Sequence, residues 1–115
     1  MATMKVVGHE LRVRFSAAER LIVWRGTLVV PLTAVRGVER IDKALRRTRG
    51  GRRGLLVSGV VKVGIWGTGA GVRQLVSVKR SVPALRITLD RTVTGFDELL
   101  ISTHDADRLA EAIGA

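Results

Sequence analysis

The sequence predicts a mainly β protein: seven or eight short antiparallel strands in a barrel or sandwich arrangement, closed by one C-terminal helix. Apolar and polar residues alternate over most of the chain, which is typical of strands with one buried and one wet face. Turn residues separate these segments at short intervals, as in antiparallel sandwiches and barrels. With 115 residues the chain forms one domain, residues 1–115, without room for a second core.

The first strands are predicted from strict alternation and from glycine and proline. Residues 11–15 alternate between apolar and basic side chains. Residues 21–25 and 27–30 are β-rich runs separated by Gly26, which predicts a tight hairpin. Pro31 cannot donate a hydrogen bond to a sheet, so it ends that strand or lies at an edge.

The next strand, residues 35–41, precedes a change in composition. Gly37 interrupts its alternation, which predicts a β-bulge at this position. Residues 42–58 then lose the strand pattern and are rich in arginine, lysine and glycine. We expect this stretch to be a flexible basic loop.

Strand character returns in the second half of the chain. Glycines at 67, 69 and 71 predict a hairpin tip rather than a nucleotide-binding loop, because strand residues follow them instead of a helix. The strands expected on this basis are residues 60–66, 72–79, 85–89 and 96–102.

The C-terminal segment, Asp105 to Ile113, changes to the helical period. Its apolar residues recur at helical spacing, side chains able to cap its N-terminus precede it, and Gly114 marks its end. The cap candidates are Ser102, Thr103 and Asp105. We expect the buried core to include Val13, Phe15, Leu28, Val30, Ile65, Val76, Val78, Leu85, Ile87, Leu89, Ile101, Leu109 and Ile113.

This order of elements resembles the pleckstrin-homology-like (PH-like) barrel, in particular the small stand-alone PH-like proteins of actinobacteria. Glu19 to Leu32 looks like the strand–glycine–strand hairpin of that family, and Val35 to Arg40 is similar to its "I-x-x-V-E" strand. Phe96 to Ser102, followed by the helix, resembles its closing strand and capping helix. The resemblance implies a binding module for lipid headgroups, peptides or proteins, and it carries over no catalytic residue and no cofactor.

The charge balance points to an anionic partner or to a bias of composition. Twenty basic residues against ten acidic ones give a formal net charge of +10, which attracts nucleic acid, anionic lipid or acidic protein surfaces. Sixteen of the twenty basic residues are arginine, and the mutational bias of a high-GC genome also enriches arginine whatever the function. The absence of cysteine excludes thiolate metal sites and disulfides, and two histidines are too few for a site built from several imidazoles.

Six cations without an intervening acid make the basic stretch the candidate polyanion site. Arginine presents a planar fork that suits phosphate oxygens, and glycines leave the backbone adaptable. No aromatic residue lies in this stretch, which disfavours binding of single strands by stacking, and a merely solvated loop is the alternative. The candidate residues are Lys43, Arg46, Arg47, Arg49, Arg52 and Arg53.

The sequence disfavours an enzyme. His9 and His104 lie outside any arrangement of nucleophile, base and carboxylate, and we expect both at the surface. The predicted function is a non-enzymatic binding or scaffold module without cofactor or metal. The expected partner is another protein, with an anionic lipid surface, nucleic acid or a homodimer through a sheet edge as alternatives. No leader or membrane-spanning run is recognised, so the expected location is the cytoplasm, including the membrane periphery.

Overall fold

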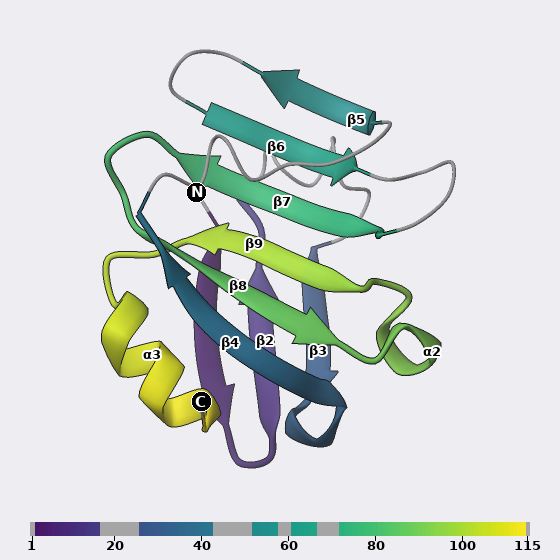
Figure 1. Ribbon diagram of the computed structural model, residues 1–115, viewed down its shortest axis with the longest axis vertical. Helices are drawn as coiled ribbons and strands as arrows, with labels where there is room; N and C mark the ends of the chain where they lie inside the picture. The colour runs from purple at the N-terminus through teal and green to yellow at the C-terminus, as the bar shows by residue number, and fades with distance from the viewer. Residues whose placement is uncertain (1, 17–25, 43–51, 58–60, 67–71, 115) are drawn as a thin grey trace.

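The computed structural model describes residues 2–16, 26–42, 52–57, 61–66 and 72–114, with the backbone alone at 52–57, 61, 62 and 66 (Figure 1). Over these ranges the chain is built from strands and a few short helices. None of the described helices is long and apolar enough to cross a membrane.

The N-terminal strands form a three-stranded antiparallel sheet. β1 pairs with β2, and β2 pairs with β3. Pro31 ends β3 as predicted, and the short 3-10 helix η1 leads from there into the second sheet. The bounds are β1 Thr3–Val7, β2 Glu10–Arg14, β3 Thr27–Pro31 and η1 Leu32–Ala34.

The remaining strands form a six-stranded sheet in the order β4-β8-β9-β7-β6-β5. A shift of register between Val35 and Gly37 confirms the predicted bulge in β4. The bounds are β4 Val35–Ile41, β5 Arg52–Val57, β6 Val61–Trp66, β7 Gln74–Lys79, β8 Ala84–Leu89 and β9 Glu98–Ser102.

The expectation of an entirely antiparallel arrangement is wrong at one place, the pair β7–β9. These two strands run parallel, with Gln74 opposite Glu98. The reason is that β9 lies between β7 and β8 in the sheet. Because β8 runs opposite to β7 and β9 pairs antiparallel with β8, β9 must run parallel to β7.

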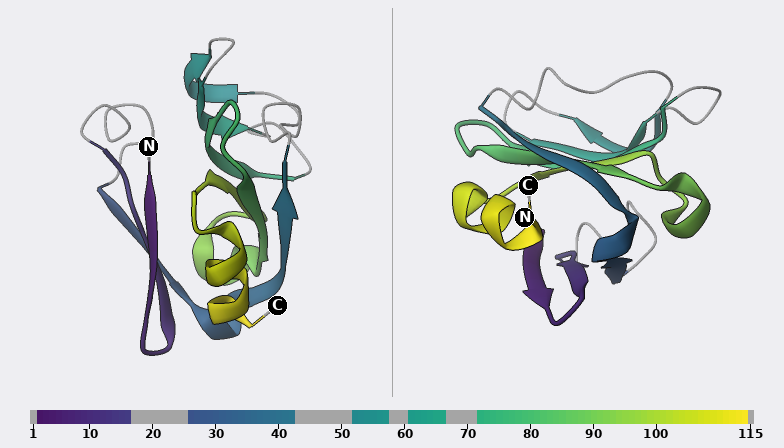
Figure 2. Two further views of the ribbon diagram at one scale, coloured as in Figure 1. Left: turned by 90° about the vertical axis from the view of Figure 1, so that its left-hand side faces the viewer. Right: turned by 60° about the horizontal axis from the view of Figure 1, so that its bottom comes forward.

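The two sheets form layers rather than a closed barrel over the described residues (Figure 2). The C-terminal helix α3, Ala106–Ile113, packs on β4, β1 and β8. It thereby lies across the side where the two sheets separate (Figure 2, left). The coarse prediction of a mainly β fold with one C-terminal helix is confirmed.

The strand inventory differs from the prediction in two segments. The structure contains nine strands in the described ranges, and β1 and β5 were not predicted. β5 places residues 52–57 in a strand, so the expected loop 42–58 is wrong there. Pairing with β6 stabilises β5, although its own sequence does not alternate. The predicted strand 21–25 and hairpin tip 67–71 lie outside the described residues.

The main core lies between the two sheets and under α3. Phe15, Leu85, Ile87, Leu99 and Ile101 are each at most 1% exposed. Leu28, predicted to be in the core, is only partly buried and packs against it. The other predicted core residues are buried: Val13, Val30, Ile65, Val76, Val78, Leu89, Leu109 and Ile113.

A second apolar cluster lies on the opposite face of the six-stranded sheet. It consists of Ile41, Val76, Val78, Ala84 and Leu100. Neighbouring side chains of a strand point to opposite faces, so burial on both faces explains why β9 is buried at every position. Sequence alternation therefore identifies the buried residues of β8 better than those of β7 and β9.

The predicted caps of α3 do not act through their side chains. Asp105 is the N-cap residue, but its side chain makes no capping hydrogen bond. Thr103 Oγ1 instead accepts from the Asp105 backbone N–H at 3.2 Å. Ser102 is buried and accepts from the Lys79 backbone N–H at 2.8 Å, so it joins two strands. Gly114 ends the helix in the left-handed region, at φ 93°.

Candidate functional site

The sequence-predicted polyanion residues fall mostly outside the described residues. Lys43, Arg46, Arg47 and Arg49 belong to the segment 43–51, which the structure does not describe. Arg52 and Arg53 open strand β5, where they lie opposite Trp66 and Ile65 of β6. The prediction of one continuous basic loop is therefore wrong for Arg52 and Arg53.

The two histidines lie at the surface, as predicted. His9 is exposed in the turn between β1 and β2, and His104 is exposed just before α3. Among the described residues, no group of three or more histidine, aspartate and glutamate side chains is placed to hold a metal ion.

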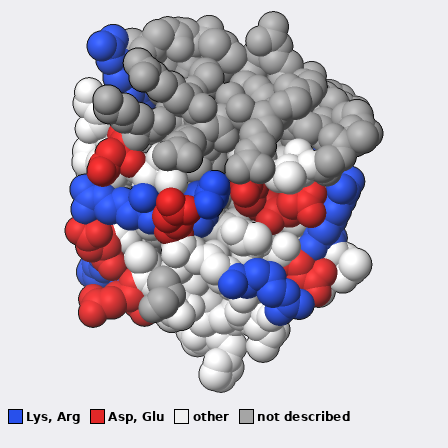
Figure 3. All heavy atoms as spheres, in the orientation of Figure 1, with Lys and Arg blue, Asp and Glu red and all other residues white. Residues whose placement is uncertain are grey.

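The arginines of β4 and β8 are paired with carboxylates. Arg36 Nη2 lies 3.0 Å from Asp90 Oδ2, and Arg86 Nη2 lies 2.5 Å from Glu39 Oε2. Figure 3 shows basic and acidic side chains beside one another on the face with these strands. Arg36 and Arg86 are therefore each compensated by a neighbouring carboxylate.

Arg40 joins β4 to α3. Its Nη1 donates to Asp107 Oδ2 at 2.7 Å and its Nε donates to Asp42 Oδ1 at 3.2 Å. The bond to Asp107, followed by the attraction of that carboxylate and the bond to Asp42, raises the pKa of Arg40 above its usual value. Arg40 is thus engaged within the chain.

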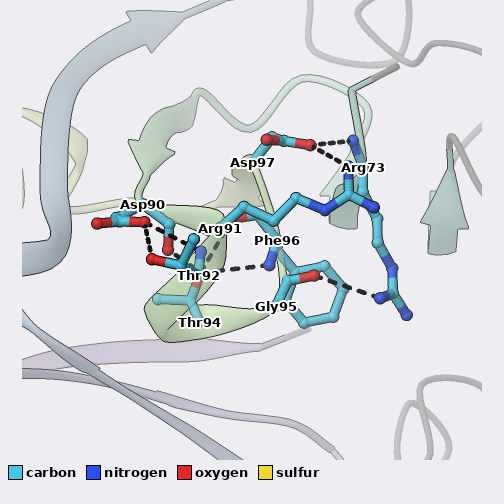
Figure 4. Close-up of polar contacts among 8 residues, drawn as sticks. All are labelled: Arg73, Asp90, Arg91, Thr92, Thr94, Gly95, Phe96 and Asp97. Atoms are coloured by element: carbon cyan, nitrogen blue, oxygen red, sulfur yellow. Dashed lines mark hydrogen bonds and ion pairs between the residues drawn. The ribbon is translucent and has the colours of Figure 1, made fainter. Parts of the chain in front are cut away.

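A second group of charged residues shapes the connection between β8 and β9 (Figure 4). The short helix α2, Arg91–Thr94, begins at Asp90, whose carboxylate accepts from the Thr92 hydroxyl at 2.6 Å and from the Thr92 backbone N–H at 3.0 Å. These hydrogen bonds, the hydroxyl first, lower the pKa of Asp90. The carboxylate is therefore occupied by the turn itself.

Asp97 and Arg73 complete this turn (Figure 4). Asp97 accepts from the Arg73 backbone N–H at 2.8 Å and lies 3.4 Å from Arg91 Nη1. The Arg73 guanidinium lies 4.9 Å from the centre of the Phe96 ring and donates to the Gly95 carbonyl at 3.3 Å. These contacts tie the residues of the cluster to one another, which indicates a structural role.

The outward face of the three-stranded sheet differs in its charge. Thr3, Arg14 and Thr27 lie opposite one another in a row across β1, β2 and β3. Lys5, Arg12 and Val29 form the next row on the same face. All six are exposed. We call the five residues Thr3, Lys5, Arg12, Arg14 and Thr27 the basic face.

Two of the three cations on the basic face have no counter-charge in the described part of the chain. Neither Lys5 nor Arg14 makes a side-chain hydrogen bond or ion pair there. Arg12 lies 3.4 Å from Glu10, with both side chains about half exposed, at 51% and 44%. Such an exposed pair is weak, so the basic face keeps a net positive charge.

The basic face is hollowed. A concavity of about 550 Å³ is lined by Thr3, Lys5, Arg12, Arg14, Gly26 and Thr27. Its described lining therefore combines cations and hydroxyl groups and contains no aromatic side chain. The arrangement can hold an anion by charge and by hydrogen bonds from neutral donors.

Sequence reasoning missed this face. The alternation of Arg12 and Arg14 with apolar residues identified them as solvent-facing, but Lys5 belongs to a strand that was not predicted. The grouping depends on the pairing of β1, β2 and β3, which no local pattern encodes. Comparison with protein-family models, with curated proteins and with solved structures gave no match.

Proposed function

We propose that this protein is a non-enzymatic binding module that holds an anionic partner on the basic face. The observation that carries the proposal is that two cations lie close together on this face without a counter-charge in the described chain. Arg36, Arg40 and Arg86 on the other sheet are each paired with a carboxylate, whereas Arg14 and Lys5 have no counter-charge among the described residues. An external anion would supply that charge.

The scaffold suits such a role. Side chains on paired strands project from a rigid backbone, so a partner meets them in a fixed arrangement. The resemblance to PH-like domains drawn from the sequence implies a binding module, and two sheets with one C-terminal helix provide a scaffold for one. The charge of the face sets its attraction to an anionic partner.

Neutralising the face should remove binding of a generic polyanion. The variant Lys5→Gln/Arg12→Gln/Arg14→Gln takes the formal net charge from +10 to +7, because three cations are replaced. Fluorescence anisotropy with labelled poly-glutamate at about 50 mM salt should show at least a roughly tenfold loss of affinity. Raising the salt past about 0.15 M should weaken wild-type binding, since the Debye length is then only about 8 Å.

Two variants of equal net charge serve as controls. Lys79→Gln/Arg80→Gln/Arg108→Gln removes three exposed cations elsewhere, and Arg46→Gln/Arg47→Gln/Arg49→Gln removes three from the basic stretch. Both should bind poly-glutamate within about twofold of wild type. Equal losses of poly-glutamate affinity in all three variants would assign binding to net charge alone. A loss only in Arg46→Gln/Arg47→Gln/Arg49→Gln would place the site in residues 43–53 instead.

A homodimer through a sheet edge stays a prediction from the sequence. Unpaired edge strands allow two copies to join by backbone hydrogen bonds. Sedimentation velocity over a range of protein concentrations would show a concentration-dependent dimer, and a single monomeric species throughout would contradict it.

A further inference from the structure

We propose that the basic face is specific for phosphoryl groups, and that it takes two adjacent ones, as in a pyrophosphate linkage. The Thr3–Arg14–Thr27 row binds one group, and Lys5 with Arg12 in the next row binds the other. This inference rests on the proposed anion-binding function and adds the chemical class of the ligand.

The first row offers the mixed donors that a phosphoryl group needs. Arg14 presents a planar fork that engages two oxygens at once, and its fork makes no other bond in the described chain. Thr3 and Thr27 lie directly opposite Arg14 on the two neighbouring strands, and paired strands are about 4.8 Å apart. A phosphoryl group has a third oxygen for such a hydroxyl, whereas a carboxylate has only two.

The second row indicates a second anionic group. Lys5 and Arg12 lie directly opposite one another on paired strands, and like charges in this position destabilise a sheet. Arg12 and Arg14 are also on one face, two residues apart along β2, at about 7 Å. A bound anion between these side chains relieves the repulsion of both pairs.

The size and lining of the concavity favour a short chain of phosphoryl groups. A volume of about 550 Å³ exceeds what one orthophosphate fills and lies within the range of small-molecule sites. The described lining, Thr3, Lys5, Arg12, Arg14, Gly26 and Thr27, has no aromatic side chain on which a nucleobase would stack.

Isothermal titration of the full chain with inorganic phosphate, pyrophosphate and citrate tests the ligand class. Pyrophosphate should bind at least about tenfold more tightly than orthophosphate, because it engages both rows. It should also bind more tightly than citrate, which carries several carboxylates but no phosphoryl group. Citrate binding as tightly as pyrophosphate would overturn the inference.

Charge-conserving and shape-conserving variants separate this inference from the proposed function. Arg14→Lys keeps the charge but loses the fork, and Thr3→Val/Thr27→Val keeps shape and strand propensity but loses the hydroxyls. Each should weaken pyrophosphate about fivefold or more while poly-glutamate binding stays within about twofold of wild type. Thr33→Val, at an exposed threonine of η1, is the matched control.

The outcomes remain distinguishable. Unchanged pyrophosphate affinity in both variants, with their folds verified by circular dichroism, would overturn the phosphoryl site and leave anion binding standing. The proposed function would be defeated instead if Lys5→Gln/Arg12→Gln/Arg14→Gln, like these variants, still bound poly-glutamate as wild type does. Co-sedimentation with vesicles containing phosphatidic acid, compared with phosphatidylserine vesicles of equal charge, distinguishes a lipid headgroup from a soluble phosphate. The inference is contradicted if the protein prefers neither phosphatidic acid over phosphatidylserine nor pyrophosphate over citrate.

Discussion

Gln74 of β7 donates a hydrogen bond from its side-chain amide to the carboxylate of Glu98 in β9, and the two residues lie opposite one another in the parallel pair. Both are buried, with exposures of 0% and 6%. A polar group deprived of its partner in such a place costs free energy, so this pair opposes any shift of register between the two strands.

Removing one member of this pair should destabilise the fold more than removing both. Gln74→Leu leaves the Glu98 carboxylate without this donor, and we expect the free energy of unfolding to fall by roughly 1–3 kcal/mol. Gln74→Leu/Glu98→Leu should lose less than the sum of the two single variants. Urea denaturation of all four proteins measures the coupling, and strictly additive losses would contradict it.

The docking of α3 should depend on Leu109. This side chain is 6% exposed and belongs to the core between the sheets. Leu109→Ala should lower the free energy of unfolding by roughly 2–5 kcal/mol, because burial is lost and a cavity remains. Glu111→Ala, on the exposed side of the same helix, is the control and should change little. Equal effects of the two changes in urea denaturation would show that the helix is not docked through this face.

The turn between β7 and β8 holds a residue in a conformation that favours glycine. Ser81 has φ 65°, and the Val82 N–H donates to the Lys79 carbonyl at 3.2 Å to close the turn. Ser81→Gly should raise the free energy of unfolding by about 0.5–1 kcal/mol, since relief of strain exceeds the entropy gained by the unfolded chain. Ser81→Val should lower it, because a β-branched residue rarely adopts positive φ. Thermal and urea unfolding should therefore show Ser81→Gly as the most stable protein, wild type as intermediate and Ser81→Val as the least stable.

Asp90 should make stability depend on acid pH. Hydrogen bonds from the Thr92 hydroxyl and backbone N–H lower the pKa of the folded carboxyl below its usual value of 3.8. A carboxyl with a lowered pKa stabilises the fold above its unfolded pKa and loses this contribution as the pH falls through the folded pKa. Asp90→Asn keeps a capping oxygen but not the charge. We therefore expect wild type to be the more stable at neutral pH, with the difference closing below about pH 4.

Thr92→Val provides the intermediate case for Asp90. It removes the hydroxyl donor and leaves the backbone donor in place. Urea midpoints measured from neutral to acid pH should therefore show a smaller acid dependence than in wild type. Identical pH profiles in all three proteins would contradict a role of Asp90 in acid stability.

Local conformation and much of the burial follow from patterns within a few neighbouring residues. Strict alternation predicts that Leu85, Ile87 and Leu89 face the core, and all three are at most 5% exposed. The helical period of the last residues predicts α3 to within one residue, and Gly37 predicts the bulge of β4. These features follow from backbone geometry and side-chain spacing within a few residues, so the local sequence suffices.

Which strands become neighbours depends on contacts between distant segments and is seen only in the folded chain. β9 lies between β7 and β8, which makes one pair parallel, and β5 exists because β6 supplies its hydrogen bonds. The same holds for the candidate site, where the row Thr3–Arg14–Thr27 joins three strands. Strand pairing is a contact between segments distant in sequence, and its energy comes from the partner as much as from the segment itself. The sequence therefore predicts that Arg14 faces solvent, but it does not predict that Lys5 and two threonines lie beside it.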